Sequence, residues 1–231
     1  RGVQDAAVTH VLPGLFRRKG GATDEGVGDL NRRHDGPLIP PAIVNVGFRS
    51  TNYWVVSAGT SRILVDIGWP GSMRQMSANL KRVGVPLSEI RYGLATHYHI
   101  DHAGLAQDFK LAGVPLLVID LQVDFIPRMK QHVKPQDGFT EITLDDNVVI
   151  SCPQSRAFLT KIGIAGEILH TPGHSDDHVS LLLDNGAVFT GDLGPMSMTG
   201  ESGDLAAASW QMLIDRGATT VYPGHGPVGR M

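Results

Sequence analysis

The chain is predicted to fold as an α/β protein, because apolar runs of strand length alternate along it with segments of helical period. The runs at 53–56 and 63–65 are typical of hairpin strands, and similar runs follow at 92–95 and 116–119. Residues 72–83 place their large apolar side chains three or four positions apart, as in an amphipathic helix. Strands and helices that follow one another in this order favour the α/β class.

The remaining elements continue this order to the end of the chain. Residues 103–112 and 204–216 are predicted as helices, and 121–132 as helical up to or around Pro127. Residues 8–16 have the pattern of a first strand. Later strands are predicted at 147–150, 165–169, 179–183, 187–190 and 221–222.

Composition limits the class of protein and its partners. The chain has 231 residues, of which 42% are hydrophobic and 19% charged, and its formal net charge is −3. This is the balance of an ordinary globular protein, and we expect one domain over residues 1–231. The charge gives no support for nucleic-acid binding, and no apolar stretch approaches the ~18 residues of a membrane span. We therefore expect no nucleic-acid or membrane partner. Composition leaves the oligomeric state open between a monomer and a homodimer, and the expectation of a small-molecule substrate rests on the family resemblance described below.

The cysteine content and the start of the chain bear on location. The single cysteine, Cys152, excludes an internal disulfide and fits a reducing compartment. Its neighbours Ile150 and Pro153 indicate a partly buried structural thiol. No secretory signal is visible, so a cytoplasmic location is expected.

Several loops are candidates for the walls of a substrate pocket. Residues 17–41 form a polar interruption with five glycines and three prolines. They predict a flexible surface loop, and a lid over the substrate site is the alternative. The other loops expected to shape the pocket are 69–72, 120–140 and 193–204.

The run from Thr96 to His102 is the most informative stretch of the chain. It places three histidines and one aspartate within six positions. His97 and His99 are two residues apart, so their side chains point the same way in an extended segment. Asp101 and His102 add an oxygen and a nitrogen ligand, and imidazole suits zinc, iron and similar ions. The run predicts a metal site rather than a surface cluster of histidines, because further ligands follow downstream.

Those further ligands are His174, Asp192 and His225. Each of the three lies at or near the end of a short apolar run and close to a glycine. Glycine lets the backbone turn sharply and approach an ion closely. A ligand at a strand end sits on a rigid element, with a loop above it to admit substrate.

This ligand order resembles that of the metallo-β-lactamase superfamily of hydrolases. The resemblance rests on the His-x-His-x-Asp-His run, the later His, Asp and His, and the strand and turn at 64–68, and it covers about residues 43–226. It implies a four-layer αβ/βα sandwich, with two mixed sheets flanked by helices. It also implies a binuclear centre in which His97, His99 and His174 hold one metal, Asp101, His102 and His225 hold the other, and Asp192 bridges the two.

The resemblance also implies the chemistry. Two Zn²⁺ ions are expected, with Fe or Mn as alternatives, and a hydroxide bound by the zinc pair attacks the substrate. Asp101, which guides the hydroxide, and the bridging Asp192 are the expected catalytic residues. No side-chain nucleophile is needed, and the chain has no Gly-x-Ser-x-Gly elbow.

Asp192 narrows the choice of substrate. True class B β-lactamases of this superfamily carry Cys or Ser at that place, whereas an Asp resembles the glyoxalase II, lactonase and phosphodiesterase branches. The chain ends six residues after His225, without the helical domain of glyoxalase II, and residues 193–198 do not match persulfide dioxygenases. The expected activity is lactonase-like hydrolysis of a small lactone, ester or thioester. A β-lactam hydrolase, a phosphodiesterase and a mononuclear-iron dioxygenase are the alternatives.

Three residues near the motif have two interpretations each. Asp66 either hydrogen-bonds around the His97 loop and orients a ligand, or caps its own turn. Trp69 either lines the substrate pocket or packs into the core. His178 is interpreted as a core histidine in preference to one that supports a ligand.

Overall fold

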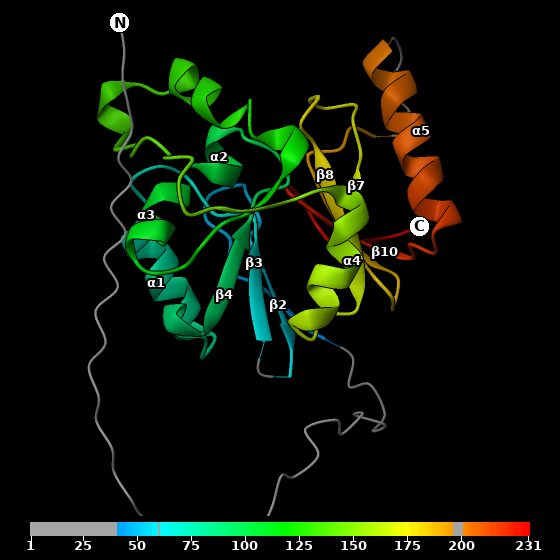
Figure 1. Cartoon of the computed structure of the whole chain (residues 1–231), viewed down its shortest axis with the longest axis horizontal. Helices are drawn as coiled ribbons and strands as arrows, with labels where there is room; N and C mark the ends of the chain where they lie inside the picture. Colours follow the sequence, from blue (N-terminus) through cyan, green and yellow to red (C-terminus); the bar gives the residue numbers. More distant parts are fainter. Residues whose placement is uncertain (1–40, 60, 196–200) are drawn as a thin grey trace, which may run out of the picture. The chain divides into compact units, whose positions relative to one another are not determined.

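Two β-sheets form the centre of the molecule (Figure 1). This computed structural model describes residues 41–59, 61–195 and 201–231. The predicted strand 8–16, and the predicted loop or lid 17–41 apart from Pro41, lie outside the described residues. These predictions, and that of one domain over 1–231, therefore stay predictions.

The first sheet has four strands in the order β1-β2-β3-β4. Neighbouring strands are antiparallel except β3 and β4, which are parallel, so the sheet is mixed. The short parallel pair β5-β6 comes next along the chain. An isolated parallel bridge joins Gly93 in β4 to Leu116, the residue before β5. The strands are β1 (Ala42–Asn45), β2 (Trp54–Ala58), β3 (Ser61–Val65), β4 (Ile90–Leu94), β5 (Leu117–Ile119) and β6 (Val148–Ile150).

The second sheet has five strands in the order β11-β10-β9-β8-β7. Only β9 and β10 are parallel, so this sheet is mixed as well. Every residue of β8 and β9 is buried, because both faces of the sheet are covered. The strands are β7 (Gly166–His170), β8 (Val179–Leu183), β9 (Ala187–Gly191), β10 (Thr220–Pro223) and β11 (Gly229–Arg230).

Helices cover the outer faces of the two sheets, except that helix α4 (Cys152–Lys161) places Leu159 in the core cluster between the sheets (Figure 1). The α-helices are α1 (Met73–Arg82), α2 (Ile100–Ala103), α3 (Ala106–Leu111), α4 (Cys152–Lys161) and α5 (Glu201–Asp215). The short 3₁₀ turns are Leu87–Glu89, Asp120–Gln122, Ile126–His132 and Pro135–Asp137.

The alternation of side chains along the strands builds four layers. On β3, Leu64 faces the core cluster that contains α1 and α3, whereas Ile63 and Val65 face the second sheet. On β8, Leu181 faces the first sheet, whereas Leu182 packs with the side chains of α5. The order helix, sheet, sheet, helix is the predicted four-layer sandwich, so the predicted fold class is confirmed.

Two predicted helices differ in detail, and one helix was not predicted. The predicted helix 103–112 is two short helices, α2 and α3, separated at Gly104 and Leu105. The segment at 126–132 is a 3₁₀ turn, with Pro127 in its first turn. Helix α4 was not predicted; Pro153 lies in its first turn, where proline is tolerated.

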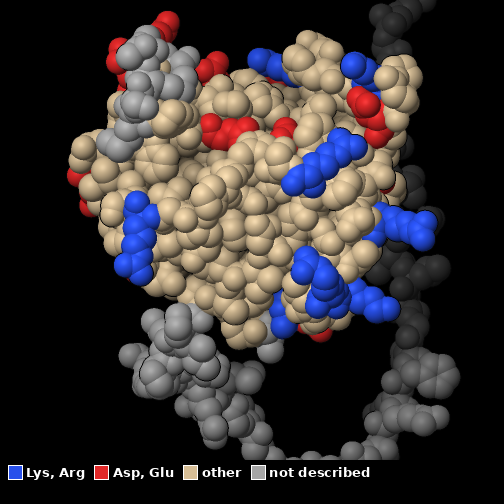
Figure 2. All heavy atoms as spheres, turned by 180° about the vertical axis from the view of Figure 1, so that it is seen from behind, with Lys and Arg blue, Asp and Glu red and all other residues tan. Residues whose placement is uncertain are grey.

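The described surface gives two further findings. No helix among the described residues combines the length and the apolar character needed to cross a membrane. On the face shown in Figure 2, acidic side chains line a hollow in the upper half, and Lys and Arg side chains stand at separate places around it.

Candidate metal centre

Four segments from the two sheets supply the candidate ligands. Residues 97–102 follow β4 of the first sheet, and Asp101 and His102 lie in α2. His174 lies in the loop between β7 and β8, Asp192 directly follows β9, and His225 follows β10. Because all these strands end at the same edge of the sandwich, residues far apart in the sequence meet there.

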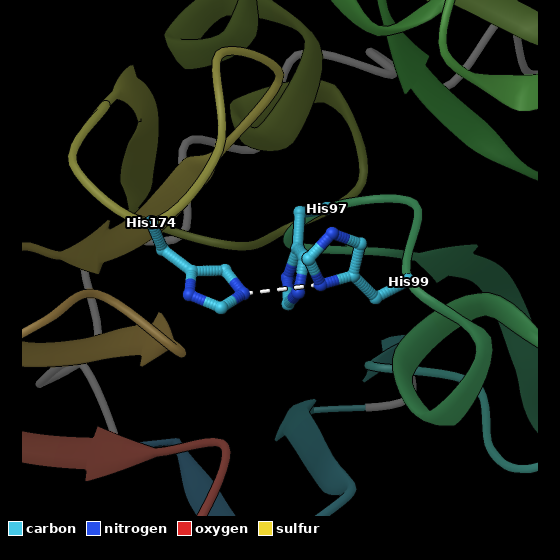
Figure 3. A group of neighbouring side chains, drawn as sticks. All are labelled: His97, His99 and His174. Carbon is cyan, nitrogen blue, oxygen red and sulfur yellow. Dashed lines mark hydrogen bonds between the residues drawn. The ribbon is translucent and has the colours of Figure 1, made fainter. Parts of the chain in front are cut away.

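The first group is made of three histidines. One ring nitrogen from each of His97, His99 and His174 lies within 4.8 Å of the others. His174 Nε2 and His99 Nδ1 are 3.1 Å apart (Figure 3). Two nitrogens ~2.0–2.1 Å from one tetrahedral zinc ion are about 3.3 Å apart, so this spacing suits a shared ion.

The second group contains Asp101, His102 and His225, whose ligand atoms also lie within 4.8 Å of one another. Asp101 Oδ2 is 3.2 Å from His225 Nε2 and 3.4 Å from His102 Nε2. One carboxylate oxygen therefore faces two imidazole nitrogens, an arrangement that a cation between them would stabilise.

Asp192 lies between the two groups. Its Oδ1 is 3.2 Å from His102 Nε2 and 3.4 Å from His225 Nε2. Its Oδ2 is 3.8 Å from His174 Nε2. One carboxylate thus directs one oxygen to each group, and all seven predicted ligand residues come together at one place.

The residues present fit a pair of metal ions. Among the described residues, the buried atoms His97 Nε2, His102 Nε2 and Asp192 Oδ1 have no hydrogen-bond partner. Buried polar atoms in native proteins normally have a partner, so three unpaired atoms at one place indicate a missing ligand. Imidazole nitrogen and carboxylate oxygen are ligands of zinc and of iron.

The centre is closed on one side and open on the other. His97 and His102 are fully buried. The side chains of His174 and His225 are 30% and 40% exposed. A catalytic metal site needs an open coordination position, and this exposure supplies access to one.

Burial and neighbouring charges shift the pKa values of three ligands in different directions. Burial, reinforced by the neighbouring imidazoles, lowers the pKa of His97 well below its usual value, so its ring is neutral. Burial also opposes charge on His102, yet the carboxylates of Asp66, Asp101 and Asp192 raise its pKa well above the usual value. Burial disfavours the charge on Asp101 too, but His102 and Thr51 hold the pKa of that carboxyl well below its usual range.

Asp66 contacts two residues of the run from Thr96 to His102 and orients one of its ligands. It is buried, and its Oδ1 accepts hydrogen bonds of 2.8 Å from the backbone N–H and the hydroxyl of Thr96. Its Oδ2 lies 2.9 Å from His102 Nδ1, which leaves His102 Nε2 directed at the centre. The interpretation that Asp66 hydrogen-bonds around the His97 loop is therefore confirmed.

A tight turn at residues 48–52 contacts Asp101 and His225 of the second group. The hydroxyl of Thr51 donates to Asp101 Oδ2 at 3.1 Å. His225 Nδ1 lies 2.7 Å from the carbonyl oxygen of Ser50. Asn52 Nδ2 donates to the carbonyl oxygens of Pro223 and Gly226 at 2.9 Å. The turn therefore contacts both ligand-bearing segments.

Gln122 ties together the loops that carry the first group. Its side chain is fully buried, and its Nε2 donates to the carbonyl oxygens of Ala95 and Asp177 at 3.1 Å. Asp177 in turn accepts the backbone N–H of Tyr98 at 2.8 Å. The loop after β4 and the loop after β7 are thus held in a fixed relation.

Two glycines permit the close approach of these loops. A Cβ at Gly224 would lie 2.6 Å from Asp192 Oδ1 and from His102 Cε1. A Cβ at Gly191, whose φ is +48°, would overlap the hydroxyl of Thr96. Both glycines are therefore required by space, and Gly191 is required by its backbone conformation as well.

Two cavities lie beside the centre. One, of about 350 Å³, is lined by His99 and His174 together with Phe125 and Arg128. The other, of about 170 Å³, is lined by Trp69, Pro70, Arg49 and other residues. The loops 69–72 and 120–140 do shape pockets, as predicted, whereas part of 193–204 lies outside the described residues.

The two interpretations of Trp69 and of His178 can now be compared. Trp69 lines the smaller cavity and also packs against the core, and its Nε1 donates to Thr51 Oγ1 at 3.2 Å. His178 is fully buried, as expected of a core histidine, and its Nδ1 lies 3.0 Å from Thr171 Oγ1. Its ring centroid is 5.3 Å from that of His97, so it also packs against the first group.

Thr51, Asn52, Gln122 and Arg128 were not predicted as site residues. None of them belongs to a recognisable motif, and each reaches the site through the fold rather than through sequence spacing. The proximity of Gln122 and Arg128 was signalled only by their place within the predicted pocket loop 120–140.

Comparison with known proteins identifies the family. The profile of the Metallo-beta-lactamase superfamily matches residues 46–225, a range that contains all seven candidate ligands. The chain belongs to the metallo-beta-lactamase superfamily. The resemblance predicted from the sequence is thereby confirmed.

Individual relatives share about 30% of their aligned residues with this chain. The beta-lactamase-like protein 2 homolog of Caenorhabditis elegans is 31% identical over 185 residues, which cover 78% of this chain and 57% of that protein. The atrochrysone carboxyl ACP thioesterase of Claviceps purpurea (strain 20.1) is 29% identical over 192 residues, which cover 78% and 52%. The chain thus spans between half and three fifths of the length of these relatives.

Solved structures share the fold. The structure of TTHA1623 in a di-iron-bound form matches with a TM-score of 0.63 at 24% identity, and the match covers 83% of this chain and 94% of that chain. At this level of identity the match establishes the architecture of the sandwich.

Proposed function

We propose that this chain is a metal-dependent hydrolase that cleaves a thioester, ester or lactone of a small molecule at a binuclear centre. The observation that carries the proposal is the position of Asp192, which directs one carboxylate oxygen to each of the two ligand groups. Relatives named as acyl-carrier-protein thioesterases favour a thioester among the three bonds. Zn²⁺ is proposed as the metal and iron as the alternative, since both accept this ligand set.

The proposed roles follow from the contacts. His97, His99 and His174 would hold one ion, Asp101, His102 and His225 the other, and Asp192 would bridge them. When bound, a metal pair supplies a hydroxide at neutral pH and polarises the carbonyl of the substrate.

The protein's own residues supply orientation and proton handling. Asp101 keeps its negative charge and is fixed by Thr51, so its free oxygen can accept a proton from an attacking water. Asp66 and Thr51 hold His102 and Asp101 in place, which keeps the reacting groups within the tolerance that catalysis requires.

The test is hydrolysis of matched substrates by the protein reconstituted with zinc. An acyl thioester, the corresponding oxygen ester and the corresponding lactone are compared by thiol or proton release. Asp101→Ala and Asp192→Asn should lower turnover by at least 100-fold, whereas Asp184→Asn, an exposed carboxylate paired with Arg156, should leave it unchanged. No turnover of any of the three substrates by protein with two bound zinc ions would overturn the proposal. Two zinc ions per chain support hydrolysis, and one iron per chain favours a dioxygenase.

A further inference from the structure

The larger cavity beside the centre has two unlike walls. One wall carries His99 and His174 of the first ligand group. The lining also includes Phe125, Arg128, Met129 and His132 from the segment around the 3₁₀ turn Ile126–His132. Its volume of about 350 Å³ lies within the range of small-molecule pockets. A substrate whose reacting bond lies at the imidazoles therefore extends along this segment.

Arg128 is held at the cavity by an aromatic ring. Its guanidinium carbon lies 4.4 Å from the centroid of the Phe125 ring. Stacking of this kind leaves the N–H groups at the edge of the guanidinium free to donate. Met129 and Ile126 of the same turn are buried in the core, so the turn that carries Arg128 is anchored.

No carboxylate among the described residues forms an ion pair with Arg128. Two aspartates line the same cavity. Asp177 is buried and accepts the backbone N–H of Tyr98, whereas Asp176 is exposed and lies in no ion pair. The stacked cation therefore lines the cavity without an ion pair to either aspartate.

From this arrangement we infer that the cavity is a specificity site in which Arg128 binds an oxyanion of the substrate, a carboxylate or a phosphate, at a distance from the bond that is cleaved. This inference rests on the proposed hydrolase function. A carboxylate would belong to the acyl part of a thioester, whereas a phosphate would belong to its thiol part. Arginine donates two parallel hydrogen bonds to either group.

The test uses two matched pairs of thioesters with the zinc-loaded protein. Succinyl and butyryl thioesters of the same neutral thiol differ by a carboxylate on the acyl side. Propionyl thioesters of 4′-phosphopantetheine and pantetheine differ by a phosphate on the thiol side. The wild type should prefer the acidic member of one pair by about tenfold in kcat/KM, the low end for hydrogen bonds to a charged group. The pair that shows the preference identifies the source of the oxyanion.

Arg128→Ala should abolish that preference and leave the neutral substrate within twofold of the wild type. Lys130→Ala is the matched control, since Lys130 lies two residues away, pairs with Glu141 and does not line the cavity. Equal kcat/KM for both members of both pairs in the wild type would overturn the inference. Equal loss on acidic and neutral substrates in Arg128→Ala would also overturn it, because that result indicates structural damage.

A binding measurement separates this inference from the proposed function. Calorimetric titration of the zinc-loaded protein with succinate or 4′-phosphopantetheine should show affinity that falls about tenfold in Arg128→Ala but not in Lys130→Ala. Binding of this kind without turnover of any thioester would retire the hydrolase function and keep the anion site. Turnover of the neutral thioesters without binding that depends on Arg128 would retire the anion site and keep the hydrolase function.

Discussion

Replacing Asp66 with asparagine tests whether this carboxylate sets the tautomer of His102. In the native protein Asp66 Oδ1 accepts two hydrogen bonds from Thr96, and Oδ2 lies 2.9 Å from His102 Nδ1. With a metal bound, the N–H of the imidazole would point at Asp66 and the lone pair of Nε2 at the centre. Asparagine keeps its oxygen on Thr96, because its NH₂ group cannot accept the two donors there. That NH₂ group then donates to His102 Nδ1 and moves the ring proton to Nε2, which can no longer bind a metal.

The size of the effect follows from the one contact that changes. Partners that orient a metal-binding histidine are worth about 10–100-fold in metal affinity, which is about 1.4–2.7 kcal/mol. The loss is confined to the group that contains His102, since His97, His99 and His174 make no contact with Asp66 among the hydrogen bonds of the described residues. We therefore expect Asp66→Asn to bind its first zinc ion as the wild type does and its second about 10–100-fold more weakly.

The assay is a zinc titration of the metal-free protein against a chromophoric chelator, with metal content measured by mass spectrometry. Circular dichroism confirms that the variant is folded. Asp184→Asn serves as the control, because it also removes one negative charge but at an exposed site away from the centre. If folded Asp66→Asn bound both zinc ions with wild-type affinity, the tautomer argument would be wrong.

Four further predictions concern other residues. Thr51→Val removes the hydroxyl that donates to Asp101, so the second zinc ion should bind about tenfold more weakly, and Thr51→Ser should restore it. Phe189→Ala removes a fully buried ring, so urea unfolding should show a loss of about 3–5 kcal/mol, and a loss below about 1 kcal/mol would refute the packing described. Burial raises the pKa of the Cys152 thiol, so iodoacetamide should react with it more slowly than with free cysteine at pH 8, and alkylation should leave zinc content unchanged. Although burial alone would lower the pKa of His102, nearby carboxylates raise it above its usual value, so zinc binding near neutral pH should release a proton from this ring; a pH indicator that detects no release contradicts this.

The candidate ligands were predictable because their signal is local. The run from His97 to His102 places four ligand residues within six positions, and His174, Asp192 and His225 each follow a strand that is apolar enough to recognise. Leu181, Leu182 and Leu183 alternate between two cores, so their apolar run indicated a strand covered on both faces.

The residues that hold the ligands in place were not predictable in the same way. Thr51 is 50 positions from Asp101 in the sequence, and Gln122 is 55 from Asp177. Threonine and glutamine are common on surfaces, and only the tertiary fold gives these two a buried partner. Helix α4 was not predicted either, and its Pro153 lies in the first turn, where proline is tolerated although it would break a helix interior.

The placement of the ligands on both sheets has a consequence for the folding of the chain itself. His99 belongs to the first sheet and His174 to the second, 75 residues further along. An ion held by both would act as a cross-link that closes a long loop, and it would bind the folded chain in preference to the unfolded chain. The free energy of such binding adds to that of folding by mass action. The two sheets are joined where the indole N–H of Trp54 in β2 donates to the carbonyl oxygen of Pro223 in β10. Hydrogen exchange of the backbone amides of β2 and β10 should therefore slow as zinc is added, well before any substrate is present.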